Sequence, residues 1–194
     1  MTNEPSTIDD ARRIWNYHHV NHTLAPAEVI IVLGSHDTRV AERGAEVFLA
    51  GWAPLIVFSG NLGALTSEIW TRPEAEIFAD VAFSRALLAE RGIHPRRVIA
   101  VQKPYMERRT LATFQQAWPE VEALVTSPQI GFDDYPNADI SRDDVIHIML
   151  GDLQRLIVYA QRGWSAPQEM PAEVTAAFER LVAAGYTRRL LPPG

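Results

Sequence analysis

The chain has 194 residues, of which 47% are hydrophobic and 22% are charged, as is typical of a globular domain. A formal net charge of −6 argues against general binding of nucleic acid, which needs a basic surface. The absence of cysteine excludes disulfides, cysteine nucleophiles and thiolate metal sites. No stretch approaches the roughly 18 consecutive apolar residues of a membrane span, and the polar residues 1–13 do not resemble a signal peptide. We therefore expect a cytoplasmic protein without a membrane span.

The first part of the chain predicts a helix, a strand, a second helix and a second strand. Ser6 or Thr7 can cap the first helix. Its apolar face would carry Ala11, Ile14, Trp15, His18 and His22. Residues 29–33 and 55–60 are apolar runs of the kind found in strands that are buried on both faces. The helix between them would stop at Gly51.

The second part of the chain continues this alternation. Pro73 suits the first position of a helix that follows the loop 61–72. Strands are predicted at 97–102 and 122–128, on either side of a helix that ends near Trp118. A long helix would run from a cap at Ser141 to Gly163, and a last helix from Pro171 to Gly185. The apolar face of the long helix would carry Val145, Ile148, Met149, Leu153, Leu156, Ile157 and Ala160.

Buried strands that alternate with amphipathic helices predict βαβ units around a mostly parallel sheet. We expect a single α/β domain over residues 1–194, a Rossmann-like three-layer sandwich with helices on both faces of the sheet. Residues 1–28 would form an N-terminal helical extension, and residues 164–194 a C-terminal helical appendage. Such sheets bind ligands beyond the carboxyl ends of the strands, where the strand order reverses.

Polar residues follow the first strand. Gly34 permits a sharp turn after it, and Ser35 lies in that turn, just before a helix whose free N–H groups can bind an anion. Asp37 could accept hydrogen bonds from ribose hydroxyls or contribute to a metal site, and Arg39 could fork onto a phosphate or carboxylate. Alternatively, Asp37 caps the helix and Arg39 pairs with it, and the sequence does not decide between these interpretations.

Two further clusters follow later strands. Ser59, Gly60 and Asn61 would let a ligand approach the backbone, although the same residues suit an ordinary turn. Neither a G-x-x-x-x-G-K-[ST] nor a G-x-G-x-x-G motif is present. After the third strand come the cations Lys103, Arg108 and Arg109, which oppose the dipole of the following helix. An anionic ligand or a carboxylate partner would offset this cost, and a solvated basic turn is the alternative.

Catalytic and metal-binding residues are less defined. Glu74 could act as a general base if it faces the pocket, although stabilisation of the helix dipole also explains it. His18 and His22 could bind a metal, but no third ligand is evident. Packing therefore explains them better, and no metal site is predicted. Whether the protein is an enzyme stays open.

These segments resemble the YdcF-like family, a bacterial domain of largely unknown function that includes the SanA-type envelope proteins. The resemblance rests on "VIIVLGS" with the following Arg39, on the G-x-A-P-x-I-V-x-S-G pattern of residues 51–60, on E-A-E at 74–76 and on "AVQKPYMERRT" at 100–110. It implies a Rossmann-like fold and a pocket at the strand ends that includes Tyr105. It also implies a nucleotide-like ligand, S-adenosylmethionine among the possibilities, and an envelope-related role.

The chain departs from the family pattern in two places. Met106 stands where a histidine usually follows the tyrosine, and the family's further strand with its N-T-x-E-N segment is lacking. The helical pattern near residues 74–90 is apolar almost all round, with Ile77, Val81 and Leu88 on one side and Phe83 and Leu87 opposite. The pattern thus predicts two helix fragments joined near 82–83, where a family segment would be missing.

The sequence leads to two functional hypotheses. In the first, the protein binds a small anionic or nucleotide-like molecule, with Asp37 as polar anchor, Arg39, Arg108 and Arg109 as anion clamps, and Gly60 as backbone donor. The reaction, if any, is not defined. In the second, the protein is a non-catalytic scaffold or interaction protein linked to cell-envelope maintenance. Its C-terminal appendage could then mediate a homodimer or cover the sheet, and packing against the chain's own core explains its apolar helical face better.

Overall fold

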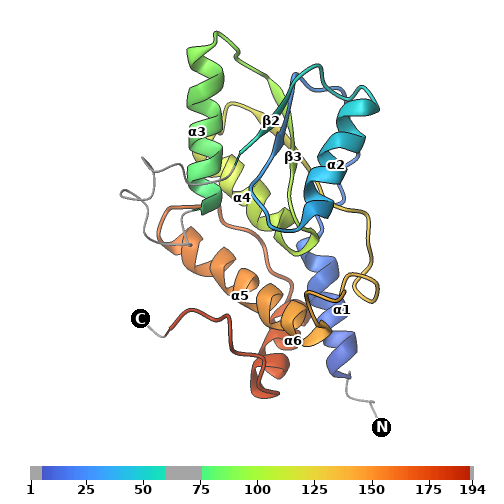
Figure 1. The fold of residues 1–194 in the computed structure, drawn as a ribbon. Coiled ribbons are helices and arrows are strands. Elements are labelled where there is room, and N and C mark those ends of the chain that lie inside the picture. Colours follow the sequence, from blue (N-terminus) through green and yellow to red (C-terminus); the bar gives the residue numbers. More distant parts are fainter. Residues whose placement is uncertain (1–5, 60–75, 193–194) are drawn as a thin grey trace.

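A computed structural model describes residues 6–59 and 76–192 of the chain. Its centre is a sheet of parallel strands, β1 (Val29–Val32), β2 (Ile56–Phe58), β3 (Arg97–Val101) and β4 (Glu122–Thr126) (Figure 1). The strand order is β2-β1-β3-β4, so the direction in which strands are added reverses between β1 and β3. This topology confirms the predicted α/β fold with a parallel sheet.

Helices cover both faces of the sheet. Helix α2 (Thr38–Leu49) packs on the face formed by Ile30, Val32, Ile99 and Val101. Helices α3 (Glu76–Glu90) and α4 (Glu107–Ala117) pack on the face formed by Val29, Ile31, Val98 and Ala100. Successive strand residues point to opposite faces, so a continuous apolar run supplies both layers of core. The predicted three-layer sandwich is confirmed.

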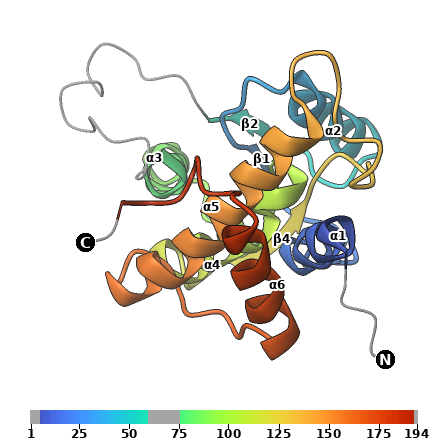
Figure 2. The same cartoon turned by 90° about the horizontal axis from the view of Figure 1, so that it is seen from below.

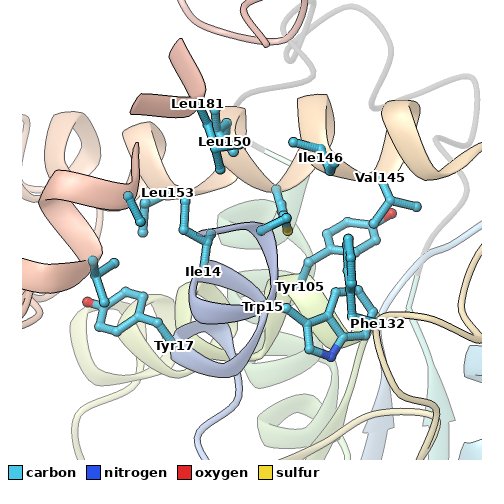
Figure 3. Close-up of a cluster of buried hydrophobic side chains, with 14 of the residues drawn as sticks. Ile14, Trp15, Tyr17, Tyr105, Phe132, Val145, Ile146, Leu150, Leu153 and Leu181 are labelled. Atoms are coloured by element: carbon cyan, nitrogen blue, oxygen red, sulfur yellow. The ribbon is translucent and has the colours of Figure 1, made fainter. Parts of the chain in front are cut away.

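A helical unit made of α1 (Thr7–His18), α5 (Arg142–Gln161) and α6 (Ala172–Ala183) lies below the sheet (Figures 1 and 2). Its core joins side chains of all three helices, including Ile14, Leu150 and Leu181 (Figure 3). The same core contains Tyr105 of the 3-10 helix η2 (Pro104–Met106), which directly follows β3. The helical unit therefore lies against the carboxyl end of β3, the edge at which ligands were expected.

The predicted helix ends agree with the structure where local chemistry decides them. Ser6 caps α1 in a reciprocal capping box with Asp9, and Ser141 caps α5 by accepting the N–H of Asp144. Gly163, just beyond α5, has a φ of 72°, a backbone conformation that favours glycine. Pro171 is the N-cap of α6 rather than its first helical residue.

The predictions for the first helix and the second strand need correction. Helix α1 ends at His18, because the chain turns away there: the N–H of Val20 donates to Glu107, and His22 accepts the N–H of Val125 in β4. Strand β2 is not buried on both faces. Within the described residues it pairs only with β1, and the Phe58 side chain is 60% exposed. Burial of a strand depends on its neighbours in the sheet, which its own sequence does not specify.

Two helical predictions are also wrong in part. Helix α3 is one continuous helix, not two fragments. Its two apolar faces are nevertheless as predicted, since Ile77, Val81 and Leu88 are buried while Phe83 and Leu87 are exposed. In α5, Ile157 is exposed although the pattern placed it on the buried face, and Ile146 and Leu150 are buried instead. Helices α1 and α4 and the 3-10 helix η2 contact α5, and its buried face also shares a core with side chains of α6, which explains why this face differs from the sequence pattern.

Candidate functional site

Gly34 is followed by the turn between β1 and α2. Ser35, Asp37 and Arg39 form one hydrogen-bonded cluster in this turn and the first residues of α2. The Ser35 hydroxyl accepts the N–H of Asp37 at 3.0 Å. The Asp37 carboxylate caps α2 by accepting the N–H of Arg39 at 3.1 Å. The Arg39 side chain forks onto the same carboxylate, with Nε at 2.8 Å and Nη2 at 2.9 Å. Of the two interpretations left open by the sequence, the cap and the pair are therefore present.

Tyr135, which no sequence pattern singled out, completes this cluster from a distant part of the chain. Its hydroxyl donates to Oδ2 of Asp37 at 2.6 Å, and its carbonyl oxygen accepts Nη1 of Arg39 at 3.0 Å. The Arg39 guanidinium also lies over the Tyr135 ring, 4.1 Å from its centroid. Both charged groups at the end of β1 thus contact a single residue of the β4–α5 connection.

The protonation states of this cluster follow from its contacts. Burial alone would raise the pKa of Asp37, but hydrogen bonds from Arg39 and Tyr135 lower it below its ordinary value. Burial, the neighbouring Tyr105 and the hydrogen bond to Asp37 raise the pKa of Tyr135. Near neutral pH, Asp37 is therefore an ionised acceptor and Tyr135 a protonated donor, as a short charge-assisted hydrogen bond requires.

The basic residues after β3 join α4 to the helical unit. Arg108 donates from Nε to the carbonyl oxygen of Tyr17 at 2.6 Å, and its guanidinium lies over the Tyr17 ring. Arg109 pairs with Asp152 of α5, with Nη2 to Oδ1 at 2.8 Å, and both side chains are almost fully buried. Lys103 is half-buried and occupies the N-cap position of η2, where its side chain makes no capping hydrogen bond. In the structure, Asp152 is thus the carboxylate partner of Arg109.

The Arg109–Asp152 pair belongs to a buried polar cluster that includes His18 of α1. Nε2 of His18 donates to the carbonyl oxygen of Met149 at 3.0 Å, because a carbonyl can only accept. Burial lowers the pKa of His18 to about 4, although the nearby Asp152 carboxylate acts in the opposite direction. Within the described residues, Nδ1 of His18, Nε of Arg109 and Oδ2 of Asp152 are buried without a hydrogen-bond partner. His18 is thus a neutral core residue.

A second guanidinium on α2 also reaches the strand ends. Arg43, one helical turn after Arg39, donates from Nε and Nη2 to the hydroxyl of Thr126, the last residue of β4. Its only described acidic partner is the exposed Glu46. The four-residue spacing from Arg39 was a usable sequence signal for Arg43. Tyr135 gave no such signal, because it lies in an irregular connection far along the chain.

The remaining predicted site residues divide into two groups. Ser59 lies at the end of β2, where its N–H donates to the carbonyl oxygen of Val32. Gly60, Asn61 and Glu74 lie outside the described residues, so their predicted roles stay predictions. Among the residues that the structure describes, no three His, Asp or Glu side chains are grouped to hold a metal ion.

The order of the parallel strands and the helices on both sides define a Rossmann-like α/β protein. No protein-family model matches the sequence. The chain is 36% identical over 207 residues to the uncharacterized protein SCO4629 of Streptomyces coelicolor, and the alignment covers 94% of each chain. The chain therefore belongs to the same family as that protein.

Proposed function

We propose that the protein binds an anionic or nucleotide-like small molecule at the carboxyl ends of its strands. The observation that carries the proposal is the position of Asp37 and Arg39, which follow β1 beside the point where the strand order reverses. Arg43 and Thr126 add a guanidinium and a hydroxyl at the end of β4. A carboxylate for hydroxyl groups and guanidinium groups for phosphate are the side chains that such a ligand needs.

The proposal includes membership of the YdcF-like family, with S-adenosylmethionine or another nucleotide as ligand and a segment missing from α3. Two observations support the missing segment. Helix α3 has a second apolar face at Phe83 and Leu87 that the described residues leave exposed. The alignment with the Streptomyces protein spans 207 residues, more than the 194 of this chain, so that protein contains residues with no counterpart here. An intact mass of 21.7 kDa is expected for the purified protein, and a clearly larger mass would contradict the missing segment.

A thermal-shift screen against nucleotides, S-adenosylmethionine, sugar phosphates and Mg²⁺ tests the ligand site. A ligand at a concentration of about 100 times its dissociation constant adds about 2.7 kcal/mol to the free energy of unfolding. For a chain of this size, this raises Tm by roughly 5–10 °C. Arg43→Ala should remove the shift. Arg96→Ala is the matched control, because Arg96 is an exposed residue just before the amino end of β3. A flat screen, or equal shifts in both variants, would contradict the proposal.

We also propose that the protein is cytoplasmic and does not bind nucleic acid, in keeping with its net charge of −6. Among the described residues, no helix has the length and apolar character needed to cross a bilayer.

A scaffold or interaction role linked to envelope maintenance is the second candidate, and the exposed Phe83 and Leu87 favour it. If these side chains mediate a homodimer, a Phe83→Asp, Leu87→Asp variant should sediment as a monomer while the wild type does not. A monomeric wild type would exclude the dimer.

A further inference from the structure

The connection between β4 and α5, residues 127–141, crosses the strand ends without forming a helix or strand. Connections in α/β units are usually about 2–6 residues long, and irregular ones beyond about 12–15 residues are commonly lids or binding loops. We call these residues the strap. Most of its residues are exposed, including Gln129, Asp134, Asn137 and Asp139. The length of the strap therefore calls for an explanation other than linking two elements.

Ile130 and Ile140, near the two ends of the strap, pack against the core of the helical unit, and two places of contact with α1 hold its middle. At the first, the Asp133 carboxylate accepts Nε and Nη2 of Arg12 from α1, each at 3.1 Å, and all of these groups are exposed. At the second, Phe132 and Tyr135 enter the core beside Trp15, with ring centroids 5.8 and 5.2 Å from its own (Figure 3 labels Trp15 and Phe132). Exposed ion pairs contribute little, so the second place mainly determines whether the middle of the strap, residues 132–135, stays closed.

Tyr135 makes the contacts at this second place that a ligand would make. Its hydroxyl occupies an oxygen of Asp37, and its carbonyl oxygen occupies a donor of Arg39. Its ring fills the space beneath the guanidinium. A ligand carrying a hydroxyl group and a planar ring could use both charged groups only after Tyr135 has withdrawn.

We infer that the strap is a lid over the strand-end site and that Tyr135 is its latch, which occupies Asp37 and Arg39 until a ligand replaces it. This inference rests on the proposed function, since it assigns Asp37 and Arg39 to the ligand. Opening moves Phe132 and Tyr135 out of the core while the sheet and the helices stay folded. The latch therefore controls access of the ligand.

Limited proteolysis with chymotrypsin measures opening without any ligand. The Phe132–Asp133 bond becomes cleavable only when Phe132 leaves the core, because that side chain is buried in the closed strap. At low protease concentration, the cleavage rate follows the population of the open form. Tyr135 precedes Pro136, and chymotrypsin does not cleave before proline, so substitution at 135 changes no cleavage site.

Tyr135→Phe removes the hydrogen bond to Asp37 and keeps the ring. Loss of a hydrogen bond to a charged group should raise the cleavage rate at Phe132–Asp133 about tenfold or more. Tyr17→Phe is the matched control, since it removes a phenolic hydrogen bond of 2.8 Å to the Glu169 carbonyl in the same core, away from the strap. It should leave the rate near that of the wild type.

Two results would overturn the latch. The first is an equal change of the cleavage rate in both variants. The second is wild-type cleavage at Phe132–Asp133 that is no faster than cleavage of bonds in the sheet, because the strap would then open only by global unfolding. A flat ligand screen with the expected cleavage pattern would instead refute the proposed function and leave the lid intact.

Discussion

The buried ion pair between Arg109 and Asp152 gives a sharp test of what the basic residues after β3 do. If the role of Arg109 is to bind an anionic ligand, its removal should leave the ligand-free protein as stable as before, or more stable. In the structure, however, its Nη2 lies 2.8 Å from Oδ1 of Asp152, and the two side chains are only 9% and 6% exposed. The pair joins α4 to α5, so Arg109→Ala should be destabilising.

The magnitude follows from the charge that the substitution leaves behind. Without Arg109, the Asp152 carboxylate would remain buried, and among described residues its Oδ2 already has no hydrogen-bond partner. Removal of one partner of a buried pair costs about 3–5 kcal/mol, which lowers Tm by roughly 6–20 °C in a chain of this size. Arg108→Ala should cost less, about 1–2 kcal/mol, because this side chain is less buried and its partners are carbonyl oxygens.

Urea denaturation of the wild type, the two single variants and the double variant Arg109→Met, Asp152→Leu provides the assay. The double variant should recover most of the stability, since replacement of a buried pair by apolar side chains is often neutral or favourable. A loss below about 1 kcal/mol in ligand-free Arg109→Ala would refute the structural role assigned to the pair. Arg109 would then be better explained as a ligand clamp.

Three further predictions concern the core. The lowered pKa of His18 means that only the unfolded chain takes up this proton between pH 6.5 and about 4. The free energy of unfolding should therefore fall by about 3 kcal/mol as the pH drops through that window, and His18→Gln should remove most of that dependence in urea melts. Leu88→Ala should cost about 2–5 kcal/mol and Leu87→Ala less than about 1 kcal/mol, because their exposures are 1% and 38%; equal costs would contradict the orientation of α3. Gly44→Ala should lower Tm despite its better helix propensity, because the added Cβ would overlap Cγ2 of Val32 and push α2 away from β1; an unchanged or higher Tm would count against that close approach.

Much of the fold follows from local sequence patterns. Strands β1 and β3 read as continuous apolar runs because both faces of the central strands are covered. The caps at Ser6 and Ser141 were predictable because the side chain and its N–H partner are three residues apart. Errors occur where partners are distant in sequence. His22 leaves the helical pattern because it accepts the N–H of Val125, and β2 is half-exposed because no described strand lies on its other side.

The candidate site was predictable to a smaller extent for the same reason. Ligands of parallel sheets bind beyond the carboxyl ends of the strands, and this rule together with the polar turn was enough to select Asp37 and Arg39. The preference of Asp for the N-cap position already predicted the alternative, a cap of α2, that the structure contains. The sequence could not show that Tyr135 contacts both, since the strap has no periodicity to fix its path. Nor could it pair Arg109 with Asp152, which depends on the packing of α4 against α5.

The contacts of the strand-end residues also favour one side of the sheet for the proposed ligand. A ligand at Arg109 would have to separate a buried ion pair and, with it, two packed helices. The proposed ligand at Asp37 and Arg39 would have to displace Phe132 and Tyr135, which lie in a connection without regular structure. Displacement of these two side chains removes them from the core of the helical unit but separates no helices, whereas separation of α4 from α5 parts two packed helices. The α2 side of the strand ends is therefore the side at which the proposed ligand could bind without separating packed helices.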